Sequence, residues 1–130
     1  MSVGVIDAGI AIAWIRGATR SRKALEGLYT ACRHGRASLV MSAVNLAEVL
    51  IHTEKYAQAS GVDPVAFLKA SGLQIHSPDE AIARRVAKLK TSLADGFAAA
   101  TAQELGARLH TTDDELVRQL HGVRLAITHY

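Results

Sequence analysis

The sequence contains little of what marks several common protein classes. One cysteine, Cys32, and two prolines occur among its 130 residues, and aromatic residues make up only 5%. A lone cysteine excludes an internal disulfide framework and favours a reducing compartment. The sequence has no histidine pair at zinc spacing, no P-loop and no GxGxxG phosphate loop. It also lacks a basic signal-peptide start, and no uncharged run approaches the roughly 18 residues of a membrane span. We therefore expect a cytoplasmic protein that does not enter a membrane.

The composition is that of a globular chain with a mild positive charge. Apolar residues make up 49%, and the length of 130 residues is typical of one domain, which we expect to span residues 1–130. The net charge of +3 is compatible with a nucleic-acid partner without identifying one. Most of the excess lies in one region, namely Arg16, Arg20, Arg22, Lys23, Arg33 and Arg36. Such a cluster is either a solvated helix face or a rim that contacts phosphates.

Short apolar runs alternate with helical patterns along the whole chain. We expect strands at 3–7, 37–42, 73–75, 106–111 and 122–127. Between them, helices are expected at 8–15, 19–34, 43–60, 64–71, from 78 onward, at 93–105 and at 113–120. Alternation of this kind predicts a three-layer α/β/α fold with a central parallel sheet of about five strands. In such sheets ligands bind beyond the carboxyl ends of the strands.

Two helix starts carry capping signals. Ser77 is expected as an N-cap with Pro78 in the first helical position and Glu80 in the third. Thr112 and Glu115 have the same spacing before the helix expected at 113–120. Both segments therefore indicate where a strand gives way to a helix.

Four acidic residues lie in mostly apolar surroundings, in "VIDAG", "NLAEVL", "SLADGFAAA" and "LHTTDDEL". They are Asp7, Glu48, Asp95 and Asp113. Carboxylates that share one cleft stay ionised only when cations compensate them, and hard oxygen ligands suit Mg²⁺ or Mn²⁺. Taken singly, Asp95 and Asp113 also fit the N-terminus of a helix, and Glu48 also fits a solvated helix position. His52 follows Glu48 by one helical turn, and we expect it at the surface.

The ordered set of these motifs resembles the PIN domain family, and within it the VapC-type toxin ribonucleases. The matching segments are Asp7-Ala8-Gly9, Asn45 with Glu48, Leu93-Ala94-Asp95, and Thr111-Thr112-Asp113. Position 9 departs from the family pattern, which usually has Ser or Thr there. Water or the hydroxyl of Ser42 is expected to replace the missing side chain.

The resemblance implies metal-dependent hydrolysis of RNA that leaves a 5′-phosphate and a 3′-hydroxyl. It implies that the four acids hold Mg²⁺ or Mn²⁺, directly or through water, while Asn45, Thr111 and Ser42 orient these ligands. The basic residues Arg16, Arg20, Arg22 and Lys23 would bind the RNA backbone. A cognate antitoxin that fills the acidic groove is the implied partner. A homodimer is also implied, with the stretches 43–60 and 64–71 as candidate surfaces.

Two other functions remain open at this point. A non-catalytic PIN-like module would bind RNA or act as a scaffold, and the loss of a side chain at Gly9 is compatible with it. A receiver-like phosphotransfer domain would also place acids at strand ends. It would require a lysine on the fifth strand, where the sequence offers Arg124.

Overall fold

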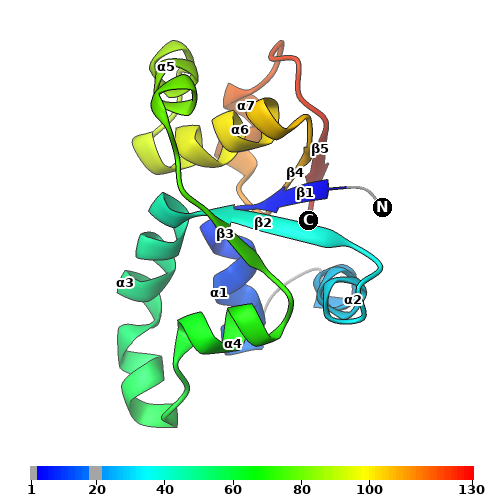
Figure 1. The fold of residues 1–130 in the computed structure, drawn as a ribbon, viewed down its shortest axis with the longest axis vertical. Helices are drawn as coiled ribbons and strands as arrows, with labels where there is room; N and C mark the ends of the chain where they lie inside the picture. The colour runs from blue at the N-terminus through cyan, green and yellow to red at the C-terminus, as the bar shows by residue number, and fades with distance from the viewer. Residues whose placement is uncertain (1–2, 18–21) are drawn as a thin grey trace.

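A five-stranded, entirely parallel sheet forms the centre of the computed structural model, which describes residues 3–17 and 22–130 (Figure 1). The strands are β1 (Val3–Ile6), β2 (Ser38–Ser42), β3 (Gln74–His76), β4 (Arg108–Thr111) and β5 (Ile127–His129), in the spatial order β3-β2-β1-β4-β5. The helices are α1 (Ala8–Arg16), α2 (Arg22–Arg33), α3 (Ala43–Ser60), α4 (Pro64–Ala70), α5 (Glu80–Lys88), α6 (Leu93–Leu105) and α7 (Asp114–Gln119).

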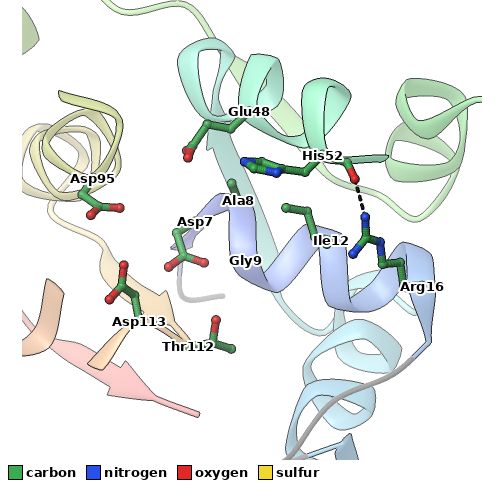
Figure 2. A pocket seen from close by; sticks show the side chains of 10 residues that line it. All are labelled: Asp7, Ala8, Gly9, Ile12, Arg16, Glu48, His52, Asp95, Thr112 and Asp113. Atoms are coloured by element: carbon green, nitrogen blue, oxygen red, sulfur yellow. Dashed lines mark hydrogen bonds between the residues drawn. The ribbon is translucent and has the colours of Figure 1, made fainter. Parts of the chain in front are cut away.

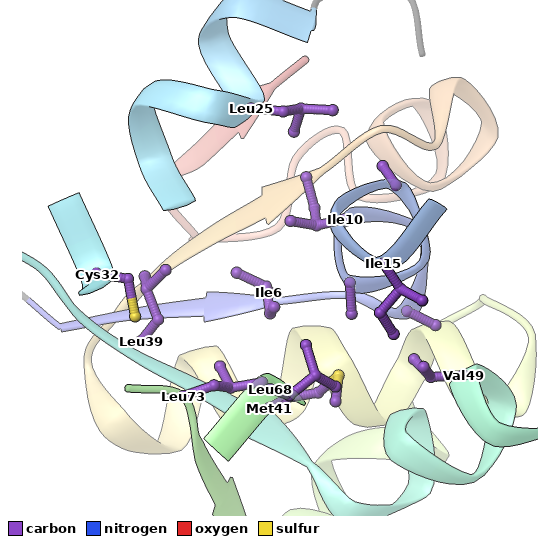
Figure 3. Close-up of a cluster of buried hydrophobic side chains, with 13 residues drawn as sticks. Ile6, Ile10, Ile15, Leu25, Cys32, Leu39, Met41, Val49, Leu68 and Leu73 are labelled. Carbon is purple, nitrogen blue, oxygen red and sulfur yellow. The ribbon is translucent and has the colours of Figure 1, made fainter. Parts of the chain in front are cut away.

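Helices cover both faces of the sheet, which confirms the expected three-layer fold. Helices α1 to α4 lie on one face and α5 to α7 on the other (Figure 1). Because successive side chains of a strand point to opposite faces, Ile6 enters the core beneath α1 and α4, whereas Val5 enters the core beneath α6. Figure 3 shows the first of these cores, in which Met41 and Leu68 are wholly buried.

The strand order makes β1 the point at which the connections between strands change direction. The chain runs outward from β1 to β2 and β3, then returns across the sheet to β4 on the other side of β1. Ile6 of β1 pairs with His110 of β4, so the residues that follow the two strands lie side by side. Ligands of open parallel sheets bind at such switch points, at the carboxyl ends of the strands.

For both helices with a predicted capping box, the structure has a different N-cap residue. Helix α5 begins at Glu80 and is capped by Asp79, whose carboxylate accepts a hydrogen bond from the amide of Ile82; Ser77 and Pro78 lie before the helix. Helix α7 is capped by Asp113 rather than by Thr112. In each case an aspartate lies directly before the first helical residue, and its carboxylate accepts hydrogen bonds from the amides of the first turn.

The fifth strand lies further along the chain than expected. The apolar side chains of Val123, Leu125 and Ile127 do pack against the core beneath α6, yet β5 extends only from Ile127 to His129. Val123 and Leu125 produce the strand-like pattern because they are partly buried, although they lie before the strand itself. At the start of the predicted helix 19–34, residues 19–21 lie outside the described part of the chain, and α2 is described from Arg22. Within the described ranges, no helix is long and apolar enough to cross a membrane.

Candidate active site

A cleft of about 390 Å³ opens at the carboxyl ends of β1 and β4 (Figure 2). All four acids singled out in the sequence line it, each from a different segment: the start of α1, the second turn of α3, the start of α6 and the loop after β4. The remaining lining residues are Ala8, Gly9, Ile12, Arg16, His52 and Thr112. The fold thus gathers side chains that are far apart in the sequence.

Asp7 is the most deeply buried of the four acids, with 5% of its surface exposed. One carboxylate oxygen, Oδ1, caps α1 by accepting a hydrogen bond of 3.0 Å from the amide of Ile10. The other, Oδ2, accepts a hydrogen bond from the hydroxyl of Thr111. Burial raises the pKa of Asp7 to about 6, and the neighbouring carboxylates of Asp95 and Asp113 add to the rise. Asp7 is therefore an acid whose charge the surrounding protein accommodates poorly.

Thr111 joins the first acidic segment to the last. While its hydroxyl donates to Asp7, it accepts a hydrogen bond of 2.9 Å from the backbone amide of Asp113. The Asp113 carboxylate in turn caps α7, with Oδ1 accepting from the amides of Glu115 at 2.9 Å and Leu116 at 3.1 Å. Asp113 thus caps a helix and also lines the cleft, so both roles considered for it in the sequence apply.

Asn45 makes the corresponding connection between the two middle segments. Its buried amide nitrogen donates to Glu48 Oε1 at 3.2 Å and to the carbonyl oxygen of Ala94 at 2.9 Å, next to Asp95. Its Oδ1 atom is buried and has no hydrogen-bond partner in the described structure. Burial also raises the pKa of Asp95, and the charges of Asp113 and Glu48 act in the same direction against a hydrogen bond from Ser92. Asn45 and Thr111 together hold the acidic segments in place.

Ser42 does not take the place expected for it. Its hydroxyl caps α3 by accepting a hydrogen bond of 3.2 Å from the amide of Val44, and Ser42 is not among the residues that line the cleft. The hydroxyl that lies against Gly9 is that of Thr112. In the sequence, Thr112 was a candidate helix cap and the middle residue of the last motif, with no role of its own, so its place in the cleft was missed.

Arg16 brings a positive charge to the end of the cleft. It lies in the last turn of α1 and donates a hydrogen bond to the carbonyl oxygen of His52 on α3 (Figure 2). The His52 side chain is exposed, as expected, and also lines the cleft. Lys23 is exposed on α2, Arg22 is described only by its place at the start of that helix, and Arg20 lies outside the described residues.

The donor atoms of the cleft fit a hard divalent cation. All four acids present carboxylate oxygens, and two of them have a raised pKa because the charged forms are buried near one another. Within 3–17 and 22–130, no group of three or more His, Cys, Asp or Glu side chains is already arranged to hold a metal ion. The cleft therefore offers the right ligand chemistry in an open arrangement.

Comparisons with known proteins identify the fold. No curated protein sequence matches the chain. A toxin–antitoxin complex from Klebsiella pneumoniae contains a similar chain, with 22% identity, a TM-score of 0.70 and 98% of both chains covered. VapBC2 from Rickettsia felis, bound to a DNA fragment from its promoter, matches with 18% identity, a TM-score of 0.68 and 98% of both chains covered. VapC20 from Mycobacterium tuberculosis, a toxin that cleaves the sarcin–ricin loop, matches with 10% identity and a TM-score of 0.67 over 88% of this chain and 93% of that chain.

At these identities the structural likeness concerns the fold. The sequence itself supplies the family, because the model of the PIN domain matches residues 4–120, which include every acid of the cleft. The chain belongs to the PIN domain family.

Proposed function

We propose that this protein is a metal-dependent endoribonuclease of the VapC toxin type that hydrolyses RNA phosphodiester bonds. The observation that carries the proposal is the convergence of Asp7, Glu48, Asp95 and Asp113 on one open cleft at the switch point of the sheet. A cleft lined by four carboxylates repels an RNA phosphate unless cations are present. The same carboxylates are suitable ligands for those cations.

In this proposal the four acids hold one or more Mg²⁺ or Mn²⁺ ions, directly or through water. The bound metal would supply a water of lowered pKa and would stabilise the charge on the phosphate oxygens. Thr111 and Asn45 keep the supporting backbone in place through their buried hydrogen bonds.

Contacts with the RNA backbone would come from the basic side of the cleft. Arg16 lines the same cleft as the acids and is exposed, and Lys23 is exposed on the neighbouring helix α2. A guanidinium at this position suits a phosphate next to the scissile one, because arginine binds phosphate through paired donors. We include Arg20 and Arg22 in this surface on their sequence positions alone.

A cognate antitoxin would be the inhibitory partner, and two copies of the chain would form a dimer. Support for the antitoxin comes from the similar chains found in toxin–antitoxin complexes. For the dimer, α3 exposes the large apolar side chains of Leu50, Tyr56 and Ile51, the last of which is 72% exposed. Helix α4 offers less than expected, because Leu68 is wholly buried in the core.

The test is RNA cleavage by the purified chain in Mn²⁺ or Mg²⁺ and in EDTA. We expect metal-dependent cleavage with 5′-phosphate products, and loss of both cleavage and Mn²⁺ binding in Asp95→Asn. Glu80→Gln is the matched control, because it removes an acid whose side chain is 81% exposed on α5 and does not line the cleft.

The same experiment separates the alternatives. RNA binding without cleavage by the wild type, in either metal, would refute the proposal in favour of a non-catalytic module. Formation of a phosphoprotein from a small phosphodonor such as acetyl phosphate would instead favour phosphotransfer. The described β5 carries Ile127, Thr128 and His129 and therefore no lysine, which counts against a receiver domain.

A further inference from the structure

Gly9 leaves a space at the cleft that a neighbouring hydroxyl occupies. A Cβ atom added to Gly9 would lie 2.6 Å from Thr112 Oγ1 and 3.5 Å from Asp7 Oδ1. The first distance is shorter than real Cβ atoms tolerate, so residue 9 cannot carry a side chain while Thr112 keeps its conformation. Two oxygens, one a carboxylate and one a hydroxyl, thus flank the small volume above the backbone of Gly9.

The surroundings of Thr112 hold its backbone and leave its hydroxyl unused. Thr111 and Asp113, on either side, are fixed by the hydrogen bonds to Asp7 and to the first turn of α7. The half-buried Thr112 hydroxyl lines the cleft and makes no hydrogen bond within residues 3–17 and 22–130. Figure 2 shows its oxygen pointing toward Asp7 and Gly9. A hydroxyl held at the wall of a polar cleft has one donor and two lone pairs available to a ligand.

We propose that Thr112 is a positioning residue whose hydroxyl, in the space left free by Gly9, orients the water shell of the divalent cation beside Asp7. This inference rests on the proposed function. It assigns to the loop after β4 a role that sequence reasoning had assigned to water or to Ser42. A side chain at residue 9 and the present side chain of Thr112 would occupy the same volume, so only one of the two residues can place a hydroxyl there.

The chemistry of the two side chains supports this assignment. Asp7 uses Oδ1 for the amide of Ile10 and Oδ2 for Thr111, and each oxygen keeps a further lone pair for a cation or its water. A hydrated divalent ion carries polarised waters that need acceptors as well as the carboxylates. The Thr112 oxygen lies against Gly9, and as an uncharged acceptor it adds no further negative charge to a crowded acidic cleft.

The test is Mn²⁺ binding by calorimetry without RNA, followed by RNA cleavage, on a set of variants. Thr112→Val keeps the shape and removes the hydroxyl, and it should weaken Mn²⁺ binding about tenfold, the size expected when a group that orients metal ligands is lost. Thr112→Ser should bind Mn²⁺ nearly as well as the wild type. Circular dichroism and thermal melting in EDTA would confirm that each variant is folded.

A double variant makes the shared position testable. Gly9→Ser alone should weaken Mn²⁺ binding, because the new side chain and that of Thr112 clash and neither hydroxyl is held in place, and Thr112→Ala alone should do so because the hydroxyl is gone. Gly9→Ser combined with Thr112→Ala should recover most of the loss, which gives a strong coupling between the two positions. Gly27→Ser is the matched control, since a Cβ at this helical glycine of α2 meets nothing within 4 Å.

The outcomes distinguish this inference from the proposed function. A wild type that binds Mn²⁺ and cleaves RNA, together with unchanged binding in Thr112→Val, would overturn the role of Thr112 alone. A double variant that binds no better than Thr112→Ala would overturn the shared position. A wild type that neither binds Mn²⁺ nor cleaves RNA would overturn the proposed function, and the inference with it.

Discussion

Replacing Asp7 by Asn should remove metal binding and at the same time stabilise the metal-free protein. Folding raises the pKa of Asp7 from 3.8 to about 6, mainly by burial, so the folded state holds the ionised form at a cost. This rise in the pKa lowers the free energy of unfolding by roughly 3 kcal/mol at pH values above 7. Asparagine has a similar shape without the charge, and it can still accept the hydrogen bond from the amide of Ile10.

The sign of the pH dependence follows from the raised pKa. Because the folded state binds this proton more tightly than the unfolded state does, Asp7 lowers the stability of the wild type as the pH rises from about 4 to above 6. The penalty is about 3 kcal/mol at about pH 7.5 and about 1 kcal/mol at about pH 4.5. One hydrogen bond is weakened in the variant, because the Thr111 hydroxyl faces an amide nitrogen in place of an oxygen; this offsets about 1 kcal/mol.

The assay is thermal and urea unfolding of both proteins in EDTA at these two pH values. We expect the Asp7→Asn variant to be more stable by about 2 kcal/mol at about pH 7.5, which is a rise in Tm of roughly 6–10 °C for a chain of this size. The advantage should nearly vanish at about pH 4.5, and added Mn²⁺ should stabilise only the wild type. A variant that is less stable than the wild type at about pH 7.5, or a stability difference that does not change with pH, would show that burial of the Asp7 charge is not costly.

Further outcomes are expected at other positions. Thr111→Val leaves the buried Asp7 carboxylate and the Asp113 amide without their shared partner, so urea unfolding in EDTA should show a loss of about 1–3 kcal/mol; an unchanged stability would contradict a stabilising role for these two hydrogen bonds. Gly4→Ala places a Cβ 2.7 Å from His110 Nε2 and 2.9 Å from Leu39 Cδ2, and the crowding should cost about 1–3 kcal/mol in the same assay. Burial and the nearby Arg108 lower the pKa of His110 to about 4, so its NMR titration should show a neutral ring at pH 5.5, while stability falls as the pH drops below 6.5 toward 4. Arg16→Ala should weaken RNA binding and reduce its salt dependence by about one ion, whereas a lost affinity with an unchanged salt slope would argue against a phosphate contact.

The layers of the fold could be predicted from the sequence because buried strands and helices differ in the spacing of their apolar residues. Strands such as Leu39 to Met41 are buried from both sides, and alternation with helices allows only a parallel sheet. The fifth strand shows the limit of this reasoning. Val123 and Leu125 are apolar because they pack on the core, and nothing in their pattern says whether their backbone pairs with β4.

The acids of the cleft could be named from the sequence, whereas their partners could be predicted only in part. Asn45 and Thr111 occur in short motifs with the acids, so they could be predicted to orient ligands. The proximity of Thr112 to Gly9 depends on how β4 packs beside β1, and it joins residues that no local spacing relates. A contact of this kind between two loops at the end of the sheet can be recognised only from the three-dimensional structure.

The central position of β1 also has a consequence for when the protein becomes active. Asp7 is made first, but its neighbours on one side, Thr111 and Asp113, belong to a strand and loop that are synthesised only after β2, β3 and most helices. A nascent chain that has not yet added β4 lacks one wall of the cleft and one side of its central strand. The proposed nuclease would therefore be inert while it is being translated, and an antitoxin would be needed only once a nearly finished chain has folded.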